Sequence, residues 1–107
     1  MSYNIEATEF FKRQLKRLVK KYPSLKSEFK TLTESLEENP EQGIPIGKNC
    51  YKIRLSIASK GKGKSGGARV ITHVYVVRQI VYLLSIYDKS EQENIPNDLL
   101  EILLRQL

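Results

Sequence analysis

The chain has 107 residues, a length that suits one domain built around one hydrophobic core, which we expect to span residues 1–107. Hydrophobic residues make up 40% and charged residues 28%, a balance that excludes a disordered chain. The net charge is +6, and no segment reaches the ~18 consecutive apolar residues of a membrane span. The first ten residues lack the layout of a secretory signal, so we expect a cytoplasmic protein that does not associate with membranes.

The chain is predicted to begin with a short strand and an amphipathic helix. Residues 3–7 alternate apolar and polar side chains, which is the period of a strand. Thr8 is a suitable N-cap for the helix that follows, and the helix has a strongly basic outer side. Its apolar stripe is formed by Phe11, Leu15, Leu18 and Tyr22.

A second helix is predicted after Pro23, which cannot continue the first one. Ser24 can cap this helix, and Asn39-Pro40 ends it. Because the break between the two helices is short, we expect an antiparallel hairpin with both apolar stripes facing one core. The next segment, "EQGIPIGKN", contains Gly43, Pro45 and Gly47 and is predicted to be a connecting loop.

Three strands and a final helix complete the chain. "CYKIRLSIA" alternates apolar and polar residues, which is typical of a strand buried on one face, whereas "ARVITHVYVV" and "QIVYLLSIY" are rich in β-branched and apolar residues. "PNDLLEILLRQL" repeats leucine at period four and predicts a closing helix. The order βααβββα favours an α+β fold, in which an antiparallel sheet carries the helical hairpin on one face.

The positive charge is concentrated in one segment. Residues 44–87 contain no carboxylate, which indicates a polyanionic partner, most commonly nucleic acid. A solubilising basic face is the alternative explanation. We expect RNA contacts from Lys48, Lys60, Lys62, Lys64, Arg78 and His73.

The glycine-rich stretch "GKGKSGGAR" (residues 61–69) interrupts the strands. Its "GKS" matches the end of a Walker A motif, but Ala58 stands where that motif needs its first glycine, and a strand follows instead of a helix. We therefore interpret the stretch as a long hairpin tip, with Lys60, Lys62 and Lys64 reaching outward to a phosphate backbone. A solvated loop without a role is the alternative.

Several segments together resemble a known family. "LKRLVKKYPSL", "CYKIRL", "GGARVI" and "LLSIYDKS" are similar to the RelE/ParE superfamily of bacterial type II toxins, and most of all to its RelE- and HigB-type branch. The resemblance covers nearly the whole chain. It implies a small ribonuclease that cuts mRNA in the ribosomal A site without a metal or other cofactor. It also implies a cognate antitoxin as partner, with DNA contacted only indirectly through the antitoxin complex.

The resemblance also implies roles for individual residues. Lys52 matches the candidate base, Arg54 a second basic residue, and Arg69 the arginine that grips the scissile phosphate. Lys89 falls where relatives place another cation, whereas Ile95 falls near the place of a tyrosine in the best-studied relatives. Tyr87 shares a strand face with Lys89 and is a candidate to stack on a base.

The chemistry of RNA cleavage is consistent with these roles. Attack by the 2′-hydroxyl needs a base, cations that stabilise the dianionic phosphorane, and an acid for the 5′-oxygen. A lysine can act as the base when neighbouring cations favour its neutral form. Lys52 and Arg54 on one strand face, with Arg69 on the next strand, supply that crowding.

Two residues and two other functions stay open at this stage. His73 shares the face of Arg69 and could carry a proton, although a strand histidine hydrogen-bonded to a neighbour is the simpler interpretation. Cys50 is interpreted as a packing residue; it can close no disulfide within the chain, and the sequence offers no cluster of metal ligands. Two alternative functions remain: a ParE-like inhibitor of DNA gyrase that is not a nuclease, and a binding module that has lost activity.

Overall fold

A computed structural model describes residues 2–61 and 66–107 of the chain. In this part of the chain, one sheet of five strands has the order β1-β5-β4-β3-β2. The strands are β1 (Asn4–Ala7), β2 (Ile44–Gly47), β3 (Cys50–Leu55), β4 (Ala68–Tyr75) and β5 (Ile80–Asp88). The helices are α1 (Glu9–Lys21), α2 (Leu25–Glu38), the 3-10 turn η1 (Ala58–Lys60) and α3 (Asn97–Arg105).

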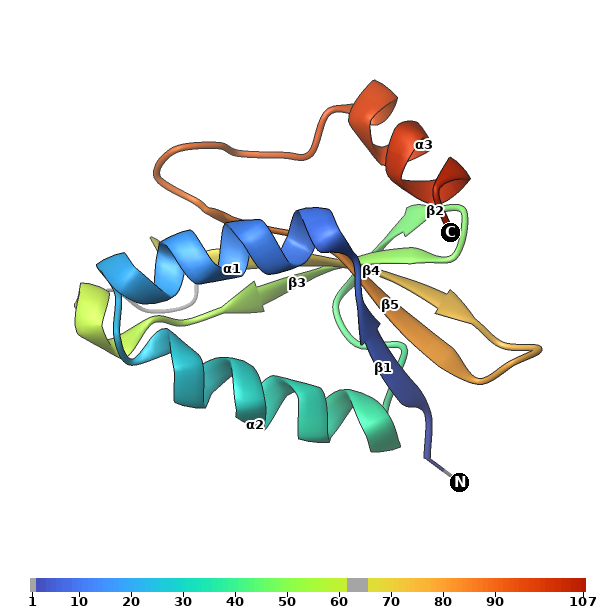
Figure 1. The fold of residues 1–107 in the computed structure, drawn as a ribbon, viewed down its shortest axis with the longest axis horizontal. Helices are drawn as coiled ribbons and strands as arrows, with labels where there is room; N and C mark the ends of the chain where they lie inside the picture. The colour runs from blue at the N-terminus through green and yellow to red at the C-terminus, as the bar shows by residue number, and fades with distance from the viewer. Residues whose placement is uncertain (1, 62–65) are drawn as a thin grey trace.

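The helices cover both faces of the sheet, and α2 and α3 lie on opposite sides of it (Figure 1). On one face, α1 and α2 bury Phe11, Leu18 and Leu36 against strand residues such as Val70. On the other face, α3 buries Leu100 and Leu103 in a second cluster, which also contains Cys50, Ile71, Leu84, Tyr87 and Ile95. The packing role predicted for Cys50 is thus confirmed, and β3 is covered on both faces at its start.

The α+β class and the helical hairpin are confirmed. Thr8 caps α1, because its hydroxyl accepts a hydrogen bond from the backbone N–H of Phe11 (3.1 Å). Ser24 is the N-cap residue of α2, as predicted, but its hydroxyl caps no backbone N–H of the helix and instead bonds the carboxylate of Glu28 and the hydroxyl of Ser59. Asn39 is the C-cap of α2, as predicted.

Two features of the sheet differ from the prediction. The expected loop "EQGIPIGKN" contains the edge strand β2, which pairs antiparallel with β3 despite Pro45. Proline is tolerated on an edge strand, where one row of backbone groups has no partner strand. In addition, β1 pairs parallel with β5, which lies between β1 and β4 in the sheet. The sheet is therefore mixed.

The closing helix is confirmed. Leu100 and Leu103 are buried, whereas Leu107 lies beyond the end of α3 and is 44% exposed. The period-four pattern identified the helix but extended it past its last turn. In the described part of the chain, none of the helices has the length and apolar character of a membrane span.

Candidate RNA-cleaving site

Three predicted site residues form a row across the centre of the sheet. Arg54 on β3 lies opposite Arg69 on β4, and Arg69 lies opposite Tyr87 on β5. Directly opposed residues of antiparallel strands have Cβ atoms about 4.5–5.5 Å apart. Two like charges therefore face each other across β3 and β4, an arrangement that destabilises a sheet unless an anion is bound.

Arg69 is buried, contrary to the prediction that it lies on an open surface. Its side chain is only 3% exposed, and its Nη1 donates to the carbonyl of Ala68 (3.0 Å). Burial, followed by the positive charge of Arg54, lowers the pKa of Arg69. A phosphate can reach this guanidinium only when the groups around it rearrange.

Lys52 points in the predicted direction and is held by a residue that the sequence did not single out. Its ammonium donates to the Oδ1 of Asn94 (2.9 Å). Lys52 borders two clefts: one of about 430 Å³ that contains Asn94, and one of about 440 Å³ that contains Arg54. Gly43 permits this arrangement, since its φ is +94° and a Cβ there would lie 2.5 Å from the carbonyl oxygen of Lys52.

The role predicted for Tyr87 as a base-stacking residue is wrong for this structure. Its ring is 3% exposed in the cluster under α3, and its hydroxyl donates to the carbonyl of Glu93 (3.4 Å). Burial raises the pKa of Tyr87, and Arg69 partly offsets that effect. Lys89 lies just beyond β5, where its ammonium pairs with Glu93 (3.3 Å). Ile95 packs in the same cluster as Tyr87 and so offers no hydroxyl where relatives carry a tyrosine.

Lys60 does not reach outward, so its assignment to RNA binding is corrected. Its side chain is 8% exposed and forms an ion pair with Asp88, which is fully buried. Tyr22 and Ser90 donate further hydrogen bonds to the same carboxylate. Burial alone would raise the pKa of Asp88, but these hydrogen bonds outweigh it and hold the pKa well below its usual range. Lys62 and Lys64 lie outside the described residues.

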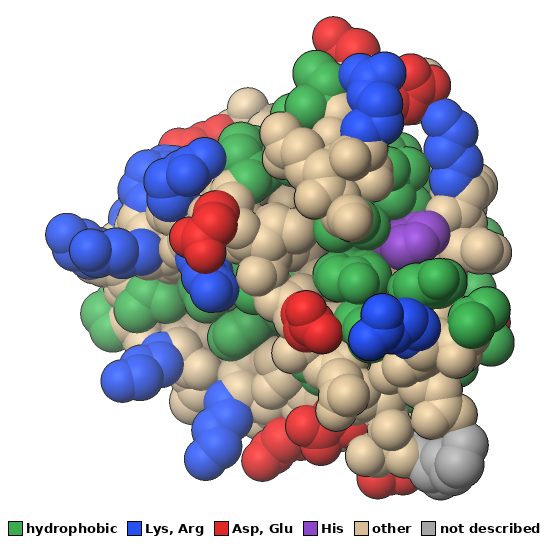
Figure 2. Space-filling model, turned by 45° about the vertical axis from the view of Figure 1, so that its right-hand side comes forward, with side chains coloured by type: hydrophobic (Ala, Val, Ile, Leu, Met, Phe, Trp, Pro, Cys, Tyr) green, Lys and Arg blue, Asp and Glu red, His purple; other side chains and the backbone are tan. Residues whose placement is uncertain are grey.

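Lys48 and His73 lie at the other end of the β3–β4 pair and do not join the row. Lys48 pairs with Glu101 of α3 (2.9 Å) and lowers its pKa. His73 faces Cys50, with Nδ1 and Sγ 3.7 Å apart, and stacks on Tyr82. Burial, only partly offset by a hydrogen bond to the backbone of Lys48, lowers the pKa of His73. Figure 2 shows this histidine among hydrophobic side chains, so the structure favours a packed histidine over a proton carrier.

Arg78 is exposed at the turn between β4 and β5. A strand rises ~3.3 Å per residue, which places the end of β4 about 20 Å from Arg69. Arg78 is therefore remote from the row of Arg54 and Arg69. Figure 2 shows further Lys and Arg side chains gathered along one side of the visible face.

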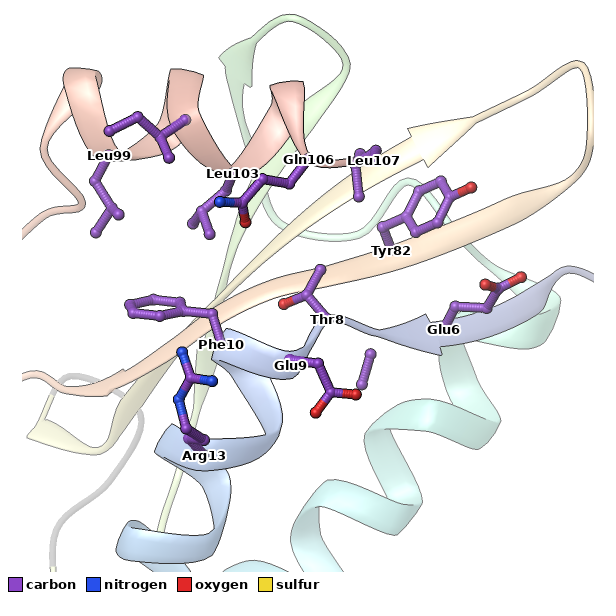
Figure 3. Close-up of a pocket in the computed structure, with 12 residues that line it drawn as sticks. Glu6, Thr8, Glu9, Phe10, Arg13, Tyr82, Leu99, Leu103, Gln106 and Leu107 are labelled. Atoms are coloured by element: carbon purple, nitrogen blue, oxygen red, sulfur yellow. The ribbon is translucent and has the colours of Figure 1, made fainter.

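A further hollow is separate from these cations. It has a volume of about 640 Å³ and lies between α3, β1 and the start of α1 (Figure 3). Glu6 and Glu9 stand at its wall beside Phe10 and Arg13, and Leu99 and Leu103 face it from α3. Two carboxylates repel a polyanion, so this hollow is a poor candidate for the RNA path.

The sequence analysis missed the acidic and amide partners of the basic strands. Asp88, Glu93, Asn94 and Glu101 all follow the carboxylate-free segment, and each contacts one of its cations or Lys89. No sequence spacing links these positions, because the contacts join residues 4 to 53 positions apart. Among the described residues, no group of three or more His, Cys, Asp or Glu side chains is arranged to hold a metal ion.

Comparison with known proteins identifies the fold. No family model matches the sequence. The free state of an Escherichia coli RelE toxin mutant, in which two arginines are replaced by alanine, is similar over 100% of this chain and 99% of its own, with a TM-score of 0.63 and 18% identity. The isolated E. coli RelE toxin is similar over 99% and 100%, with a TM-score of 0.59 and 21% identity.

A structure of a toxin–antitoxin complex is also similar. The RelBE2 complex of Mycobacterium tuberculosis matches over 82% of this chain and 99% of its own, with a TM-score of 0.59 and 17% identity. These matches span nearly the full length of the RelE structures. The chain therefore has the fold of the RelE toxins.

Proposed function

We propose that this protein is the toxin of a bacterial type II toxin–antitoxin system and that it cleaves mRNA in the ribosomal A site without a metal. The observation that carries this proposal is the cluster of Lys52, Arg54 and Arg69 across β3 and β4. Within the described residues, Arg54 makes no ion pair and Lys52 is held by an amide rather than a carboxylate. The positive charges of Lys52 and Arg54 are thus left for an external anion.

The cluster can supply most of the groups that RNA cleavage requires. Lys52, in its neutral form, takes the proton of the 2′-hydroxyl, and the 2′-oxygen attacks the adjacent phosphorus. Arg54 stabilises the charge that develops on the phosphorane oxygens, and Arg69 joins it once the groups that bury its guanidinium rearrange. The bond from phosphorus to the 5′-oxygen breaks, and we expect Lys89 to return a proton to that oxygen, since the hydroxyl of Tyr87 is buried and hydrogen-bonded.

The partners follow from the same function. The RelE and RelBE2 structures include complexes with an antitoxin or an antitoxin peptide. We expect a cognate antitoxin to neutralise this chain, and DNA to be contacted only through that antitoxin. The ribosome supplies the mRNA in an extended form, which suits a site whose clefts lie along one edge of the sheet. Action at the ribosome requires a cytoplasmic protein.

Substitution of the clustered cations tests the proposal. We expect Lys52→Ala and Arg69→Ala each to lower mRNA cleavage about 100-fold or more and to relieve growth arrest, because each removes a group that acts in the transition state. Lys26→Ala, which removes an exposed cation from α2 on the opposite face of the sheet, is the matched control and keeps activity. Cleavage is measured by mapping transcript ends in a reconstituted translation reaction.

Two outcomes contradict the proposal. If both variants cleave mRNA at the wild-type rate, the cluster is not the catalytic site. If expression of the wild-type chain breaks DNA in a gyrase-dependent manner and leaves mRNA intact, the chain acts in the manner of ParE.

A further inference from the structure

We propose that Asn94 reads a base of the bound RNA and so sets the sequence preference of cleavage. The base enters the cleft of about 430 Å³ beside Lys52. This inference rests on the proposed ribonuclease function and adds a specificity-determining residue to it.

The cleft has the composition of a base-binding site. Ile46, Pro96 and Leu100 supply apolar surface, and Lys52, Asn94 and Asn97 supply polar groups. Small-molecule sites of ~300–1,000 Å³ commonly combine apolar walls with a few convergent polar groups. A planar base can pack its faces on the aliphatic walls while its edge meets the amides. With Tyr87 buried, aliphatic packing takes the place of aromatic stacking.

Asn94 lines the cleft, and its carboxamide is held at its oxygen by Lys52. Its Oδ1 accepts from the ammonium of Lys52 (2.9 Å), and its backbone carbonyl accepts from the side chain of Gln92 (3.0 Å). Its Nδ2 makes no hydrogen bond with the described residues, and the residue is exposed. Asn94 therefore presents an N–H donor to the cleft, with the second lone pair of Oδ1 beside it. Carboxamides discriminate between bases through this donor and acceptor pair.

The position of Lys52 links base recognition to phosphate binding. Lys52 lines the cleft with Asn94 and also the neighbouring cleft of about 440 Å³, which contains Arg54. β2 borders both, through Ile46 in the first and Ile44 in the second. A nucleotide whose phosphate lies between Lys52 and Arg54 thus has its base within reach of Asn94.

Two substitutions separate base reading from a positioning role. Asn94→Ala removes both the contact with the base and the acceptor for Lys52. Asn94→Asp keeps an oxygen acceptor for Lys52 but replaces the N–H donor with a second acceptor, so it reverses the polarity of the group that faces the base. The measurement is the relative cleavage of mRNAs with each base at each position around the cut, in a reconstituted translation reaction.

We expect wild-type protein to prefer particular bases at one position near the cut. Asn94→Ala lowers that preference about tenfold, and Asn94→Asp shifts it toward bases that present an amino group. Asn4→Ala, on the opposite edge strand β1, is the matched control and keeps the wild-type profile.

The results distinguish this inference from the proposed function. If wild-type protein cleaves mRNA but has no base preference, or if both variants keep the wild-type preference while total cleavage falls uniformly, Asn94 only positions Lys52 and the inference is wrong. If the wild-type protein cleaves no mRNA, the ribonuclease function fails and the inference fails with it. Circular dichroism melts verify that each variant is folded.

Discussion

Two adjacent places on the β4–β5 pair treat buried charge in opposite ways. At the first, Asp88 is fully buried and is compensated by Lys60, with further hydrogen bonds from Tyr22 and Ser90. At the second, one register position away, Arg69 is 3% exposed and faces the like charge of Arg54. Removing one partner of a buried ion pair strongly destabilises the folded state, because it leaves a buried charge unpaired. A buried cation that faces another cation instead raises the free energy of the folded state. We infer that the first place anchors the fold and the second serves function.

The largest expected effect on stability comes from removing the cation that pairs with Asp88. Lys60→Met leaves the carboxylate of Asp88 buried without its cation, and we expect the free energy of unfolding to fall by about 3–5 kcal/mol. Urea denaturation measures this loss. Lys89→Met is the matched control, because the Lys89–Glu93 pair is more exposed and such pairs contribute at most ~1 kcal/mol. Equal losses in both variants would refute the anchoring role of Lys60.

An intermediate loss of stability is expected when the pH is lowered. The folded pKa of Asp88 lies below its ordinary value of 3.8, so its contribution to stability is complete above that value and is lost as the pH falls toward the folded pKa. We expect the unfolding free energy of the wild type to drop below pH ~4, and more steeply than that of Asp88→Asn, which cannot titrate at this position. Parallel curves of stability against pH for the two proteins would contradict the assignment.

The smallest effect is expected from removing the buried cation that faces Arg54. Arg69→Met replaces a desolvated charge with an apolar side chain of similar length, and we expect the free energy of unfolding to stay within about 1 kcal/mol of the wild type or to rise. The same urea series as for Lys60→Met gives the direct comparison. A loss as large as that of Lys60→Met would mean that the contacts of Arg69 fully compensate its burial.

Local periodicity explains which parts of the fold could be predicted. The stripes of α1 and α2 repeat at the helical period, and the strands β3 to β5 show their type through alternation or β-branched residues, so each was predicted from neighbouring residues alone. β2 was missed, because its four residues include Pro45 and Gly47 and its strand conformation depends on pairing with β3. The parallel pairing of β1 was missed for the same reason, since the residues of one strand do not show whether its neighbour runs parallel or antiparallel.

The candidate site was predicted only in part. Alternation along β3 places Lys52 and Arg54 on one face, and this was predicted correctly because the period is local. The opposition of Arg54 and Arg69 depends on register, and the burial of Arg69 and Tyr87 depends on packing across the sheet. Neither the register nor the packing can be read from one strand.

By itself, the sequence determined the secondary structure of most of the chain and the excess of positive charge between residues 44 and 87. These properties follow from residues close together in the chain. The tertiary structure alone decided which of the described cations meet an acidic partner. It folds the acidic residues of 88–107 onto Lys60, Lys89 and Lys48, and leaves Arg54 facing Arg69. The physical reason is that Coulomb interactions depend on distance in space, and only the folded chain sets those distances.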